Sequence, residues 1–230
     1  MRVTSSDTMQ AILLGMVVEA LNLADPPGME AACLILPGFL NPLESPVLNH
    51  MTPDALRDWF ARAPDGPCTW ISGEVIVLAE HLEVVAFQFD QDRYLMFFSA
   101  LEATLGTDPD LAEDVLQNWV GTFRPAKDHR LIKFIRADAN DPEQMFDYHL
   151  WPLRNPRQVF QFGQFLVDVA MQHWQTMRYI TQYLYQPAYP ALTKLYQRTL
   201  KNHEGCRQAG FRPILNSDIE SGGYYGCEKT

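Results

Sequence analysis

EVVAFQFDQDRYLMFFSAL, residues 83–101, is the stretch that decides the fold class. It holds two apolar runs rich in β-forming residues, separated by the polar link Asp90, Gln91 and Asp92. Apolar runs joined by such a short polar link predict a β-hairpin. A third run, CTWISGEVIVLA at 68–79, comes just before it, so the sequence predicts three antiparallel strands in succession.

Further strands and helices surround this hairpin. HRLIKFIRA at 129–137 and QMFDYHLWPL at 144–153 are two more strand candidates. Apolar residues at helical spacing predict helices over 8–23, from about 108 to 120, from 156 to about 185 and over 191–202. Because the strands come in hairpin-connected runs, the sequence predicts an α+β fold: an antiparallel sheet of about five strands flanked by helices, with a C-terminal helical extension.

The predicted domain organisation is one α+β domain with an appendage. Residues 1–185 form the domain, and Pro-rich residues 25–66 form an inserted loop with a short helix that Thr52 caps and Pro53 begins. Residues 186–230 form a helical extension and a tail that we expect to be irregular from Gly205 or to order only on a partner.

Composition limits the function classes. The chain has 230 residues, 47% of them hydrophobic, and a net charge of −10, which disfavours sequence-independent binding of nucleic acid through the whole surface. No apolar run approaches the length of about 20 residues that a membrane span needs. We expect a cytoplasmic protein with no membrane partner, reduced cysteines and no cofactor. A Cys206–Cys227 disulfide in an oxidising compartment is the alternative for that pair.

The order of elements resembles the fold shared by YbjN-like proteins and class I type III secretion chaperones. The stretches that carry the resemblance are EDVLQNWVGTF, HRLIKFIRADANDPEQMFDYHLWPL and the aromatic helix that begins NPRQVFQF. YbjN-like sequences commonly have a second Asn after the Trp, where this chain has Val120. The resemblance covers residues 8–23 and 68–185, and it implies a non-enzymatic protein that binds another polypeptide, often as a homodimer.

The helical section after residue 156 holds the candidate partner surface. Its charge balance is positive, with Arg157, Arg178, Lys194, Arg198 and Lys201 against Asp168, whereas residues 1–155 are strongly acidic. It is also rich in aromatics, and aromatics together with arginine favour protein interfaces. The candidate contact residues are Phe165, Trp174, Arg178, Tyr183 and Tyr189. A large aromatic core against the sheet is the competing interpretation of the same residues, and we expect nucleic acid as a partner only within a larger complex.

Two other function classes remain open from sequence. The first is a metal-dependent or acid–base enzyme whose site gathers Glu80, His81, Asp147 and His149, because Glu80 adjoins His81 and the other two share one strand face. No catalytic motif supports an enzyme otherwise. The second is a structural component of a nucleoprotein or viral assembly. The sequence favours an adaptor or chaperone-like subunit that binds another protein or its own copy.

Overall fold

The computed structural model describes residues 51–100, 125–137, 156–185, 190–214 and 225–230. The helix expected over 8–23, the helix expected near 108–120 and the strand expected over 144–153 lie outside these residues, as does Cys33. The helices are α3 (Pro53–Trp59), α6 (Pro156–Thr176), α7 (Pro190–Asn202) and α8 (Glu204–Gln208). The strands are β1 (Cys68–Ile71), β2 (Ile76–Ala79), β3 (Leu82–Asp90), β4 (Asp92–Ser99), β5 (His129–Arg136), β6 (Gln182–Tyr185), β7 (Phe211–Ile214) and β8 (Tyr225–Lys229).

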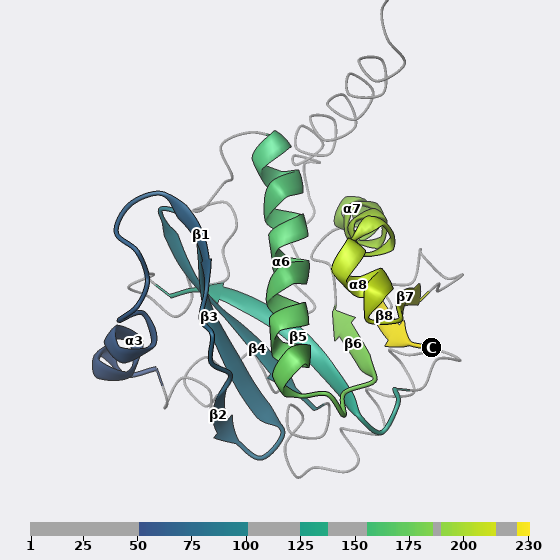
Figure 1. Cartoon of the computed structure of the whole chain (residues 1–230), viewed down its shortest axis with the longest axis horizontal. Coiled ribbons are helices and arrows are strands. Elements are labelled where there is room, and N and C mark those ends of the chain that lie inside the picture. Colours follow the sequence, from purple (N-terminus) through teal and green to yellow (C-terminus); the bar gives the residue numbers. More distant parts are fainter. Residues whose placement is uncertain (1–50, 101–124, 138–155, 186–189, 215–224) are drawn as a thin grey trace, which may run out of the picture.

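One mixed sheet organises these elements. Its eight strands follow the order β1-β3-β4-β5-β6-β8-β7, with β2 pairing beside β1 on β3. All pairs are antiparallel except β5 with β6, which run parallel. Two parallel neighbours need a crossover connection, and α6 lies in the chain between them. Figure 1 shows α6 running across the sheet, with α7 and α8 beside it near β7 and β8.

The alternation of side chains along β3 sends two apolar sets to opposite faces of the sheet. Val85, Phe87 and Phe89 pack with residues of α6 in one core. Val84 and Ala86 pack in a second core, to which α3 contributes. Because both faces of the sheet are covered, eight of the nine β3 residues are buried. The sequence of β3 is therefore a mostly apolar run, without the polar–apolar alternation of a half-exposed strand.

Local signals place the short elements where the sequence predicts them. Thr52 Oγ1 accepts a hydrogen bond from the Ala55 N–H at 3.2 Å, and Pro53 occupies the first turn of α3. Asp90, at the β3–β4 turn, has a φ of 58°, a conformation that Asp adopts more readily than most residues. The register that pairs Phe89 with Asp92 confirms the predicted hairpin.

The α+β class is confirmed, but the predicted sheet was wrong in two respects. Within the described residues it has eight strands rather than about five, and it is mixed rather than purely antiparallel. The helix expected to reach about residue 185 ends at Thr176, and Gln182–Tyr185 becomes a strand between β5 and β8. The apolar residues of this segment have helical spacing, but pairing with β5 and β8 supplies backbone hydrogen bonds on both sides and stabilises the strand instead.

The C-terminal residues also differ from the expected helical extension and irregular tail. α7 and α8 are helical, but β7 and β8 are strands of the same sheet. Gly226 makes this possible, because a Cβ at that position would lie 1.9 Å from the Tyr183 carbonyl oxygen. Only glycine permits such a close backbone approach.

Cys206 and Cys227 are free thiols in the core, and burial raises the pKa of Cys206 to about 12. No helix in the described part of the chain is long and apolar enough to cross a membrane.

Candidate functional site

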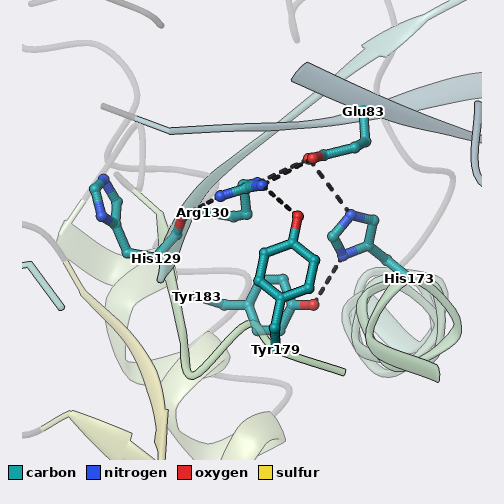
Figure 2. Close-up of polar contacts among 6 residues, drawn as sticks. All are labelled: Glu83, His129, Arg130, His173, Tyr179 and Tyr183. Carbon is teal, nitrogen blue, oxygen red and sulfur yellow. Dashed lines mark hydrogen bonds and ion pairs between the residues drawn. The ribbon is translucent and has the colours of Figure 1, made fainter. Parts of the chain in front are cut away.

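A buried ion pair joins strands β3 and β5, which lie on either side of β4. Arg130 Nε and Nη2 each donate to one carboxylate oxygen of Glu83 at 2.8 Å, so the contact is bidentate. The side chains are 2% and 3% exposed. Figure 2 shows the dashed contacts between Arg130 and Glu83. This fork-to-fork geometry is the strongest that an arginine offers a carboxylate, and the dry surroundings strengthen it further.

Arg130 also connects this pair to the surface. Its Nη1 donates to the His129 carbonyl oxygen at 2.9 Å, and its Nη2 donates to the Tyr179 hydroxyl at 2.9 Å. The guanidinium carbon lies 5.7 Å from the centre of the Tyr179 ring. Because Tyr179 is 52% exposed, its ring stands at the surface while its hydroxyl is held from below.

His173 extends the network from α6 to β6. Its Nδ1 lies 2.8 Å from the Tyr183 hydroxyl, its Nε2 lies 3.6 Å from Glu83 Oε2, and its ring stacks on Phe98 at 3.8 Å. Burial lowers the pKa of His173 more than the nearby Glu83 carboxylate raises it, so the ring is neutral near pH 7. The favourable tautomer has the proton on Nε2, facing the carboxylate, and lets Nδ1 accept from Tyr183.

The charge state of the pair follows from its contacts. Burial alone would raise the pKa of Glu83, but the hydrogen bonds and charge of Arg130 overcome it and leave that pKa below its usual range. The same carboxylate raises the pKa of Arg130 despite burial. Glu83, Arg130, His173 and Tyr183 are all at most 3% exposed, so a substrate cannot reach them. The network therefore orients α6 and Tyr179 on the sheet, a structural role.

A separate open groove lies between β1 and α6. Its volume is about 720 Å³. Its lining residues are Pro67, Cys68, Thr69, Phe89, Asp90, Arg157, Gln158, Phe160, Gln161, Gln164, Phe165 and Asp168. Phe160 is 38% exposed, which is unusual for a large aromatic. Gln158 Nε2 donates to Asp90 Oδ2 at 3.2 Å and fixes the start of α6 at the end of β3.

The outer edge of β1 borders this groove. Ser72 N–H donates to the Ala86 carbonyl at 2.8 Å, and Trp70 faces Gln88 in the register. Because backbone groups of an antiparallel strand alternate in direction, the N–H and C=O of Thr69 and Ile71 point away from β3. Within the described residues, β3 is the one strand that pairs with β1. The groove thus combines an aromatic wall with a strand edge.

The candidate partner residues fall in different places. Phe165 is partly buried and lines the groove, and Arg178 is exposed near the end of α6. Trp174 and Tyr183 are 7% and 1% exposed and pack in the core on the α6 face, as the competing core interpretation has it. Tyr189 lies outside the described residues.

The alternative metal set is described only in part. His81 Nε2 lies 3.6 Å from Glu80 Oε1 at the exposed β2–β3 turn. Asp147 and His149 lie outside the described residues. Among the residues that the structure does describe, no group of three potential ligands could hold a metal ion.

Sequence reasoning missed Glu83, Arg130 and Tyr179. A weak signal for Glu83 existed, because it shares the strand parity of Val85 and Phe87 and therefore had to face the same core. A carboxylate on a buried face requires a partner, but nothing in the sequence says that the partner is Arg130, 47 residues further on.

Comparison with known proteins adds no family. No family model, no curated protein and no solved structure matches the chain.

Proposed function

We propose that the chain is a non-enzymatic adaptor or chaperone-like subunit that binds an extended segment of another protein along the outer edge of β1, against α6. The observation that carries the proposal is the groove of about 720 Å³ between that edge and the aromatic side chains of α6. Main-chain hydrogen bonds at a strand edge provide affinity, and an adjoining pocket selects side chains of the incoming strand.

The chemistry of the groove suits a polypeptide. Phe160 and Phe165 offer apolar contact area, and the neighbouring glutamine amides Gln161 and Gln164 offer donors and acceptors. The unpaired N–H and C=O groups of a strand edge are a template on which another chain can pair. The resemblance to YbjN-like proteins and secretion chaperones, drawn from sequence, points to the same class of function. We further propose a cytoplasmic location, either as a homo-oligomer or within a larger complex.

The test uses the direction of one backbone N–H. Thr69→Pro removes an N–H that points away from β3, so the β1–β3 pairing is retained while the outer edge loses a donor. Thr69→Val is the matched control because it keeps that N–H. Full-length wild type and both variants are purified from the native host, and co-purifying protein is quantified by mass spectrometry together with light scattering.

We expect a protein partner at fixed stoichiometry with the wild type and Thr69→Val, and its loss with Thr69→Pro. In the wild-type complex, hydrogen exchange at the amides of Thr69 and Ile71 slows relative to the free chain. Equal partner recovery with both variants, or unchanged exchange at these amides, would refute binding at the β1 edge. Circular dichroism of both variants checks that the fold is retained.

A further inference from the structure

Two cations share one aromatic ring at the end of α6. The guanidinium carbon of Arg178 lies 3.9 Å from the centre of a Trp174 ring, and Lys229 Nζ lies 4.5 Å from it. Both cations are exposed, whereas Trp174 is 7% exposed. Arg178 follows α6 and Lys229 ends β8, so only the folded chain brings them together.

Neither cation has an acidic partner among the described residues. Six of the other arginines that the structure describes are paired with carboxylates: Arg57, Arg62, Arg130, Arg136, Arg207 and Arg212. Glu228, the acidic neighbour of Lys229 in sequence, is paired with Arg212 at 3.0 Å. On a chain with a net charge of −10, two cations on one ring that have no carboxylate partner in the described part of the chain form a local positive site.

The surroundings hold this site in shape. Arg178 Nε donates to the Gln175 carbonyl at 3.3 Å, and Lys229 N–H donates to the Thr181 carbonyl at 2.8 Å. The adjacent Tyr179 is anchored by the buried Arg130 at its hydroxyl. Groups that are already ordered lose little conformational entropy when a ligand binds. In addition, Trp174 Nε1 is buried without a hydrogen-bond partner in the described part of the chain.

We propose that Arg178, Lys229 and Tyr179 form a second binding surface, which takes the carboxylates of an acidic protein segment. Arg178 presents a planar fork that matches a carboxylate, Lys229 adds a point charge, and the exposed Tyr179 ring offers apolar contact. A nucleic-acid backbone fits less well, because two cations on a strongly acidic chain neutralise few phosphates.

This surface is distinct from the groove. None of its three residues lines the groove, which lies at the other end of α6 near Arg157 and Phe160. It stands independently of the proposed function. If both surfaces are occupied, one chain bridges an extended segment at β1 and an acidic segment at the end of α6.

The test is fluorescence anisotropy of the full chain with a short labelled peptide of alternating Glu and Phe. The comparison probes are the matched Gln–Phe peptide and single-stranded oligothymidine. We expect the Glu–Phe peptide to bind, more weakly as salt rises, and the Gln–Phe peptide not to bind. Arg178→Gln weakens binding by about tenfold, the effect of losing one charge-assisted contact. The double change Arg178→Gln with Lys229→Gln abolishes it.

The matched control is Arg57→Gln, which removes one exposed cation on α3, a helix that packs against the opposite face of the sheet. It should leave peptide binding unchanged. An equal loss with Arg57→Gln would show that binding reflects overall charge and would overturn the proposal. Equal binding of the Gln–Phe peptide, tighter binding of oligothymidine, or no binding of the Glu–Phe peptide would also overturn it.

Discussion

Removing one partner of the buried Glu83–Arg130 pair should destabilise the fold far more than removing both. The side chains are 3% and 2% exposed and share two hydrogen bonds of 2.8 Å. Glu83→Gln leaves the Arg130 guanidinium without a counter-charge in the interior, which costs about 3–5 kcal/mol of unfolding free energy. Glu83→Leu combined with Arg130→Met removes both charges, and replacement of both ions by apolar groups is often neutral or stabilising.

The assay is urea unfolding of Glu83→Gln, of the single variants Glu83→Leu and Arg130→Met, and of the double variant that combines the last two, followed by far-ultraviolet circular dichroism. The expected result is a double variant more stable than Glu83→Gln, with similar denaturant dependence in all variants. The matched control is Glu74→Gln, because the Arg62–Glu74 ion pair is 84% and 70% exposed and its loss should be barely measurable. A loss below about 1 kcal/mol for Glu83→Gln, or additive losses in the double variant, would refute the reasoning.

The remaining predictions concern strand packing and pH. Gly226→Ala should lower the unfolding free energy by about 3 kcal/mol or more, because the new Cβ would lie 1.9 Å from the Tyr183 carbonyl oxygen. Thermal melts measure the loss. Gly73→Ala is the control, because the space around a Cβ at that position is open. Unfolding free energy should also fall with acidification. In the folded chain the pKa of His173 lies below its ordinary 6.5, so the unfolded chain takes up a proton first as the pH falls below about 6.5, and the folded state loses stability. The lowered pKa of Glu83 adds a further loss of unfolding free energy below about pH 4.5. Urea titrations across this pH range test this, and a flat profile, or one that His173→Gln leaves unchanged above pH 5, would contradict the assignment.

The sequence by itself determined the elements whose signals are local. Apolar runs rich in β-formers around Asp90 predicted the β3–β4 hairpin, and Thr52 with Pro53 predicted the start of α3. These succeed because a turn or a cap is specified by residues a few positions apart. The α+β class follows from the same local information.

Only the tertiary structure decided which strands pair and which polar groups meet. Residues 182–185 carry helical spacing, yet they form β6 because β5 and β8 lie on either side of it. The segment after Gly205 supplies β7 and β8, since Gly226 lets the chain approach Tyr183 closely.

The candidate sites depend on the same long-range packing. Glu83 meets Arg130, and Arg178 meets Lys229 over Trp174, from segments far apart in sequence. Sequence could supply these residue types, but a residue's partner across the chain depends on register and on the crossing of α6 over the sheet. Those are set by the burial and hydrogen bonding of the whole fold, so no local pattern records them.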